Sequence, residues 1–191
     1  MIIAIDLDGV VFGTEEYYRT YAQFYDMEFV KNGVVDKTAM DVHTRFGWEQ
    51  KYADDFYSKY TETVLQSAPI RPGAKYVLEK LKQMGHTLVC ITLRGYYRDC
   101  EISITEQRLK QENIVFDKII YSQKNKLDAC LAENVDVIVD DNPVTMELLS
   151  KNNIKCLHMR GAGLKSAIHP NITCVQNWAD VLQNIITLDK K

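Results

Sequence analysis

The sequence lacks several features that would place it in a specialised class of protein. None of its segments reaches the run of about 18 apolar residues that a membrane-spanning helix needs. No block of lysine and arginine marks a surface for a long polyanion. The five cysteines are odd in number and include no Cys-x-x-Cys pair, so we expect reduced thiols rather than a disulfide framework. These absences predict a cytoplasmic protein that binds neither a membrane nor a nucleic acid polymer, and they leave its oligomeric state open.

The N-terminal sequence argues against an export signal. Asp6 and Asp8 interrupt the first apolar run, and no basic residue precedes it. The chain has 191 residues, of which 46% are hydrophobic and 26% charged, and its formal net charge is −3. These values suit one globular domain with a small insertion, whose core needs no metal or disulfide to fold. A small anion held by a few local cations remains an acceptable ligand for such a chain.

Segments of strand length alternate with segments of helical periodicity along most of the chain. Short apolar or β-branched runs predict strands, and apolar residues three or four positions apart predict helices. This alternation predicts right-handed crossovers and a Rossmann-like α/β fold, in which helices flank a parallel sheet. The expected strands are 2–7, 86–93, 115–121, 135–139 and 155–159, and the expected helices are 72–84, 98–112, 124–133, one starting at Asn142-Pro143, and one from Trp178 to Ile186.

Residues 13–69 interrupt this alternation and are expected to form a helical insertion after the first strand. Two helical segments, 15–30 and 48–66, carry many aromatic residues at helical spacing. Packing between helices is the default explanation for such stripes. Phe12 and Phe46 fall outside the regular stripes and are candidates to face a ligand. The expected domains are an α/β core of residues 1–12 and 70–191 and a small helical cap of residues 13–69 over one edge of the sheet.

Side chains suited to catalysis follow three of the predicted strands, and a lysine begins a helix beside them. Ligands of open parallel sheets bind at the carboxyl ends of the strands, so we expect these side chains to gather there. Each of them alone has an ordinary explanation as a turn, a helix cap or a solvated lysine. Together they form one candidate site. The candidate residues are Asp6, Asp8, Thr92, Leu93, Arg94, Lys126, Asp140 and Asp141.

Gathering several carboxylates is unfavourable unless a cation joins them. Two carboxylates about 4 Å apart repel by about 4 kcal/mol at an effective dielectric constant of ~20. A bound Mg²⁺ explains the cluster, because it takes oxygen ligands and also binds phosphate oxygens. Thr92 can donate a hydrogen bond to a phosphoryl oxygen, and Lys126 supplies a compact positive charge near a helix N-terminus. The pattern therefore predicts chemistry on a phosphoryl group.

In this order, Asp6-Leu7-Asp8-Gly9-Val10, Thr92, Lys126 and Asp140-Asp141 resemble the four motifs of the haloacid dehalogenase (HAD) superfamily, and the match spans nearly the whole chain. The resemblance implies a Rossmann-like core with a small helical cap inserted after the first strand. It implies that Asp6 is a nucleophile that forms an aspartyl-phosphate. Asp8 is then the general acid for the leaving group and the base for the hydrolytic water. Val10 replaces a threonine common in relatives, and we do not expect that change to be disabling.

The same resemblance implies a magnesium-dependent phosphomonoester hydrolase acting on a small phosphorylated metabolite. Mg²⁺ would be bound by Asp6, the backbone oxygen of Asp8, and Asp140 or Asp141. Thr92 and Lys126 would hold the phosphate, together with the Leu93-Arg94 segment. Arg94 has two interpretations that the sequence does not separate: it grips the phosphate, or it joins the sheet to the cap through a salt bridge.

A finer resemblance concerns the substrate. The stretch from Ile91 to Arg94, followed by Thr105-Glu106, resembles the 5′(3′)-deoxyribonucleotidases and related bacterial nucleotidases. That resemblance implies a nucleoside monophosphate substrate with a cap aromatic stacked on its base. A sugar phosphatase or a phosphomutase would use the same four motifs. A phosphate-binding module without activity is the remaining alternative, and the intact acid/base Asp8 argues against it.

Overall fold

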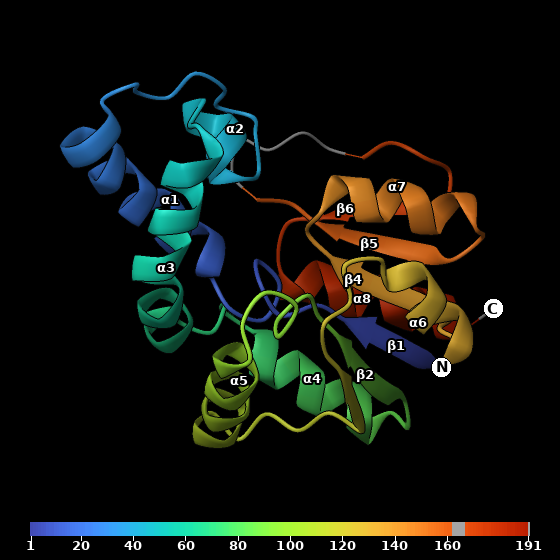
Figure 1. Ribbon diagram of the computed structural model, residues 1–191. Coiled ribbons are helices and arrows are strands. Elements are labelled where there is room, and N and C mark those ends of the chain that lie inside the picture. The colour runs from blue at the N-terminus through green and yellow to red at the C-terminus, as the bar shows by residue number, and fades with distance from the viewer. Residues whose placement is uncertain (162–166, 191) are drawn as a thin grey trace.

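The computed structural model describes residues 1–161 and 167–190. Within them, one parallel sheet has the strand order β3-β2-β1-β4-β5-β6 (Figure 1). The order reverses its direction between β1 and β4, and open α/β sheets bind ligands at such a switch point. The strands are β1 (Ile2–Ile5), β2 (Thr87–Ile91), β3 (Lys118–Ile120), β4 (Val137–Asp140), β5 (Lys155–Met159) and β6 (Ile172–Val175).

Helices cover both faces of the sheet (Figure 1). Ile3 and Ile5 of β1 pack with residues of α4, α5 and α8 on one face, whereas Ala4 packs with residues of α6 and α7 on the other. This alternation follows from the two-residue period of a strand. It produces the buried, parallel α/β core that the sequence predicts. The helices are α4 (Ala74–Gln83), α5 (Cys100–Gln111), α6 (Lys126–Ala132), α7 (Pro143–Lys151) and α8 (Trp178–Asp189).

Most of the expected strands are longer than the observed ones, and two further differences concern α4 and β6. Asn142 caps α7 as expected, because its side chain accepts hydrogen bonds from the next two free backbone amides. Pro72, however, does not open α4, which begins at Ala74 after Gly73 in a left-handed conformation (φ 84°). Strand β6 was not expected. Its residues alternate poorly, and Thr173 and Cys174 are exposed at the edge of the sheet.

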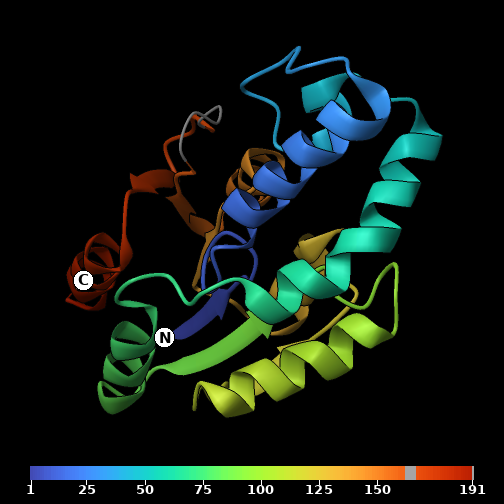
Figure 2. The same ribbon diagram turned by 90° about the vertical axis from the view of Figure 1, so that its left-hand side faces the viewer.

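The insertion after β1 forms a second helical layer with its own core. Figure 2 shows α1 and α3 beyond the arrowheads of β1 and β2, so they lie past the carboxyl edge of the sheet. Aromatic residues dominate the core of the insertion, and rings from α1 and α3 contact one another. The elements are α1 (Thr14–Tyr25), the π-helical turn η1 (Asp26–Val30), α2 (Val42–Phe46) and α3 (Gln50–Ser67).

The prediction that Phe12 and Phe46 face a ligand is wrong, since both are 1% exposed. The Phe46 ring stacks on Trp48 with centroids 5.1 Å apart, inside the core of the insertion. The Phe12 ring lies between two guanidinium groups, those of Arg94 and Arg108, each 5.2 Å from its centroid. Neither ring offers an open face to a base.

The chain enters and leaves the insertion at one place. Gly13 donates its backbone N–H to the Pro69 carbonyl (2.9 Å), and Arg71 donates to the Val11 carbonyl (2.8 Å). The buried Trp178 of α8 donates its indole N–H to the Val10 carbonyl (2.9 Å), which ties the last helix to the loop after β1. This loop is therefore held from both sides. No helix in the described part of the chain is long and apolar enough to cross a bilayer.

Candidate active site

A buried lysine joins the ends of the two strands that flank the switch point. Asp6 follows β1, and its backbone N–H binds the Val139 carbonyl of β4 (3.0 Å). Lys126 is the first residue of α6, which Asn125 caps. The Lys126 Nζ lies 2.6 Å from Asp6 Oδ1 and 2.6 Å from Asp140 Oδ2. The structure thus brings together three of the residues that the sequence singled out.

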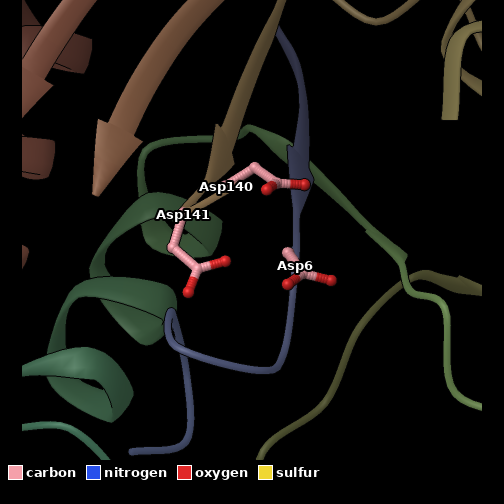
Figure 3. A group of neighbouring side chains, drawn as sticks. All are labelled: Asp6, Asp140 and Asp141. Carbon is pink, nitrogen blue, oxygen red and sulfur yellow. The ribbon is translucent and has the colours of Figure 1, made fainter. Parts of the chain in front are cut away.

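Asp6, Asp140 and Asp141 surround one small space between the ends of β1 and β4 (Figure 3). One carboxylate oxygen from each lies within 4.8 Å of the others, and all three residues are buried. A hard divalent cation prefers such an all-oxygen donor set. The geometry therefore fits Mg²⁺, although it does not by itself identify the ion.

The two neighbouring aspartates differ in how their carboxylates are used. Asp140 binds Lys126 with one oxygen and the Asn142 backbone N–H with the other (2.7 Å). No hydrogen bond from the described residues reaches the Asp141 carboxylate. His158 on β5 donates from Nε2 to the Asp141 backbone carbonyl (3.0 Å) and so holds the turn that carries it. Asp141 is consequently the carboxylate with free oxygens for a cation.

The electrostatics of the cluster favour a bound cation. Burial, with help from neighbouring Asp140 and Asp8, raises the pKa of Asp6 to about 7 despite Lys126. Burial, Asp140 and Asp6 raise the pKa of Asp141 well above its ordinary value. Burial disfavours the charged Lys126 ammonium, but the attraction of Asp140 and Asp6 outweighs it and raises the pKa of Lys126. The lysine stays charged, and the carboxylates need a further positive charge to ionise together.

Asp8 pairs with Arg94 rather than with Lys126. The two Asp8 oxygens accept from Arg94 Nε (2.9 Å) and Nη2 (2.7 Å), which is a bidentate pair. Burial favours the neutral acid, but the Arg94 charge and its hydrogen bonds outweigh it and lower the pKa of Asp8. The Arg94 fork is engaged by Asp8, and the structure gives it no salt bridge to the insertion among the described residues.

Thr92 and Leu93 follow β2 at the same edge of the sheet. Ile5 of β1 pairs with Cys90 of β2, so both strands end side by side. Thr92 is fully buried and its hydroxyl accepts from the Arg94 backbone N–H (3.3 Å), whereas Leu93 is 37% exposed. The contacts of the described residues do not join either of them to the aspartates or to Lys126. Their part in phosphate binding therefore stays a prediction.

Gly9 is the residue that allows the loop after β1 to approach Asp141. Its φ is +71°, a left-handed conformation that glycine adopts readily. A Cβ on Gly9 would lie 1.8 Å from Asp141 Oδ2. Thr14 also supports this loop, because its hydroxyl accepts from the Gly9 backbone N–H (3.2 Å). The Asp-x-Asp-Gly pattern already includes the glycine that this position needs. No pattern in the sequence indicates that Thr14 supports the loop.

A cavity of about 480 Å³ opens beside the loop at Gly9. Its charged lining comes from the start of α1, from the return segment near Pro69, and from the end of β5. The sequence did not predict this cavity. The Arg71 Nη1 donates to the Gly9 carbonyl (2.6 Å), so the cavity borders the loop that carries Asp8. Its charged residues are Glu15, Glu16, Arg19, Arg71 and Arg160. Three of these residues lie on α1, but Arg71 and Arg160 come from distant segments, and no local pattern connects them to α1.

The strand order, the insertion after β1 and the aspartates at the switch point define a fold. The chain has the fold of the haloacid dehalogenase superfamily, as the sequence resemblance implies. It is similar over 98% of its length to a HAD-superfamily hydrolase from Ehrlichia chaffeensis, with 96% of that chain covered, 16% identity and a TM-score of 0.58.

Two further relatives carry more particular names. A predicted phosphatase from Clostridium acetobutylicum is 19% identical, with 97% of this chain and 98% of that chain covered and a TM-score of 0.69. A protein of Oceanobacillus iheyensis named "Putative nucleotidase OB0422" is 23% identical over 150 residues, which are 76% of this chain and 77% of that protein. No protein-family model matches the sequence.

Proposed function

We propose that this protein is a magnesium-dependent phosphomonoester hydrolase that acts through an aspartyl-phosphate on Asp6. The observation that carries the proposal is the Lys126 bridge between Asp6 and Asp140, with Asp141 facing Asp6 across the switch point. Packing alone gives no reason to bury three carboxylates around one lysine. A phosphoryl group and its cation do give such a reason.

In the first step of the proposed reaction, the Asp6 carboxylate attacks phosphorus and the bond from phosphorus to the leaving oxygen breaks. Asp8 must be protonated for this step, against the Arg94 charge that lowers its pKa, and it gives that proton to the leaving oxygen, so the alcohol leaves neutral. In the second step a water molecule attacks the aspartyl-phosphate, and Asp8 accepts the proton of that water. The phosphorus–Asp6 bond breaks, inorganic phosphate leaves, and both aspartates return to their starting states.

The remaining residues supply charge and position. Mg²⁺, when bound by Asp6, Asp141 and the backbone oxygen of Asp8, neutralises phosphoryl charge. Asp140 is assigned to Lys126, because both of its oxygens are already used. Lys126 and the Thr92-Leu93 segment hold the phosphate. Within this proposal, residues 13–69 act as a cap over the site.

The test is phosphate release from an aryl phosphate with Mg²⁺, compared between the wild type and Asp6→Asn. We expect turnover in the wild type and none in the variant, whose buried position tolerates the isosteric amide. Thermal unfolding of both proteins serves as the control for folding. Near-normal turnover in Asp6→Asn would remove the covalent mechanism. A wild-type protein that binds phosphate without releasing it from any ester would favour the binding-module alternative.

A nucleoside monophosphate is the substrate class we favour within this function. The similarity to the protein named as a nucleotidase and the resemblance of the stretch from Ile91 to Arg94 support it. Most aromatic rings of the insertion pack on one another, although Phe24 and Phe29 are exposed. We assign the base-stacking role to Tyr96 and Tyr97, because they directly follow the predicted phosphate-binding segment. These rings are 46% and 67% exposed on the loop after Arg94. Sugar phosphates and phosphomutase substrates remain the alternatives.

Comparing catalytic efficiencies tests this substrate class. Stacking is worth about 1–3 kcal/mol per base, or roughly a 5- to 150-fold preference over a sugar phosphate. The measurement is kcat/KM for ribo- and deoxyribonucleoside monophosphates against sugar phosphates of similar size. Equal efficiencies would reject the nucleotide while leaving the phosphatase in place. Return of the phosphoryl group to another position of the sugar would identify a mutase.

We also propose a cytoplasmic setting. All five cysteines are free thiols, and three of them are buried in the core, which suits a reducing compartment. Free-thiol counts on protein purified without reductant would test this proposal.

A further inference from the structure

Arg94 is held on every side by the protein. Its Nε and Nη2 bind the two oxygens of Asp8, and its Nη1 donates to the Thr105 hydroxyl on α5 (3.0 Å). The Phe12 ring lies against the guanidinium plane, 5.2 Å from Cζ to the ring centroid. The Arg94 carbonyl also accepts from the Ser122 backbone N–H (2.9 Å). Each guanidinium nitrogen therefore has a protein partner, and the side chain has little freedom to turn toward a ligand.

The side chains of Arg94 and Asp8 differ strongly in solvent exposure. The Arg94 side chain is 3% exposed, whereas the Asp8 side chain is 36% exposed. A phosphate that enters the site therefore meets Asp8 before it can reach the guanidinium. An arginine that binds phosphate directly needs an open fork, and this fork is closed by a carboxylate.

The bidentate pair still leaves Asp8 able to meet a substrate. A carboxylate has about four lone-pair positions, two on each oxygen, and the Arg94 fork occupies one edge of the group. The Thr14 side chain is a further hydrogen-bond partner of Asp8, and the exposed side of Asp8 keeps the remaining positions. Two parallel hydrogen bonds from a planar donor also fix the direction of the carboxyl plane, which one hydrogen bond does not.

We propose that Arg94 is a positioning residue, which aims the Asp8 carboxyl at the leaving oxygen and does not itself bind the phosphate. This inference rests on the proposed function, because it needs Asp8 to transfer a proton to the leaving group. The sequence left two roles open for Arg94, binding the phosphate or joining the sheet to the cap through a salt bridge. The role proposed here differs from both. It also makes the fork, rather than the positive charge alone, the feature that matters.

The test uses Arg94→Gln and Arg94→Lys with two substrates, an aryl phosphate with a good leaving group and an alkyl phosphate with a poor one. The measurement is the single-turnover rate of phosphoenzyme formation, together with the inhibition constant of inorganic phosphate. Proton donation matters most for the poor leaving group. A misplacement of about 1 Å can lower a rate about 10²-fold, so we expect that loss on the alkyl phosphate and less than about 10-fold on the aryl phosphate. The phosphate inhibition constant should change less than about 3-fold, because a positioning residue does not bind the phosphate.

Arg94→Lys provides a readout that a merely structural role would not move. Lysine keeps the charge but is a point donor without the fork. The Arg94→Lys variant should therefore show most of the rate loss on the alkyl phosphate that Arg94→Gln shows. Thr105→Val is the matched control, since it removes one partner of Arg94 and leaves both bonds to Asp8. We expect its ratio of alkyl to aryl rates to stay close to that of the wild type. Should Arg94→Gln fail to fold, the lysine variant and this control still decide the question.

Each outcome has one meaning. Equal losses on both substrates with weakened phosphate inhibition would identify Arg94 as a phosphate ligand and overturn the inference. Full activity of Arg94→Lys on the alkyl phosphate would show that charge suffices, and this also overturns it. A wild-type protein that cleaves neither substrate would instead refute the proposed function, and the variants are not needed for that result.

Discussion

Replacing Gly9 with alanine tests whether the loop after β1 sets the position of Asp141. The new Cβ would lie 1.8 Å from Asp141 Oδ2 and 2.5 Å from its Cγ, so the buried carboxylate must move. The backbone also has φ +71°, and an L-residue in the left-handed region costs about 1 kcal/mol. We expect this strain to lower the melting temperature by about 2–4 °C in a chain of this size.

The expected functional effect of Gly9→Ala is a loss of metal affinity. Displacing an oxygen that we assign to Mg²⁺ should raise the half-saturating Mg²⁺ concentration about 10- to 100-fold. Substitutions of residues that orient metal ligands typically lower metal affinity by this amount. The assay is phosphate release as a function of Mg²⁺ concentration, with melting temperature measured at each concentration. The rate at saturating Mg²⁺ should recover in part, since Asp6 itself is not changed.

Gly33→Ala is the matched control for backbone strain. Gly33 has φ +72°, and a Cβ there would meet nothing within 4 Å. Both variants should carry a similar backbone strain, but only Gly9→Ala also displaces Asp141, so it should lose more stability and need more Mg²⁺. An unchanged Mg²⁺ dependence in Gly9→Ala would refute the assignment of Asp141 to the metal. A higher half-saturating Mg²⁺ concentration in Gly33→Ala would show that backbone strain alone lowers metal affinity, and would refute the argument from the contact between position 9 and Asp141.

Three other predictions concern the metal, the buried charges and the last helix. Chelator should abolish turnover and Mg²⁺ should restore it, while Ca²⁺ should substitute poorly because it prefers a larger coordination number; full activity in excess chelator would exclude a metal. Because the pKa of Asp6 is raised from 3.8 to about 7, the folded state binds a proton more tightly than the unfolded state. Metal-free wild type should thus lose stability relative to Asp6→Asn as pH rises from about 4 to about 7, and urea unfolding in chelator that gave a constant difference would contradict this. Trp178→Phe leaves the buried Val10 carbonyl without its donor and should cost about 1–3 kcal/mol of unfolding free energy, whereas a loss within error would mean that the carbonyl finds another partner.

The core of the fold was predictable because its signals are local. Strands such as β4 are short β-branched runs, and Asn142-Pro143 is a sequence pattern that caps a helix by itself. The carboxyl-end rule then predicts that Asp6, Lys126 and Asp140 lie together. Strand β6 was missed because its edge position leaves two of its four residues exposed, which removes the apolar signal.

The parts of the site that were not predictable depend on contacts between distant segments. The partner of Arg94 is Asp8, which lies 86 residues away in the sequence, and nothing near either residue indicates the other. The cavity near Gly9 combines three separate segments. The different uses of Asp140 and Asp141 are set by Lys126 and by a backbone amide, so neighbours of the same type could not be told apart from the sequence.

The hydrogen bond from Trp178 to Val10 spans 168 residues of sequence. This bond links two segments that are made at different times. The loop that carries Asp8 follows the first strand, whereas its donor follows the sixth. All six strands are therefore made before the residue that fixes this loop. A chain that stops before Trp178 should carry the nucleophile without a finished site.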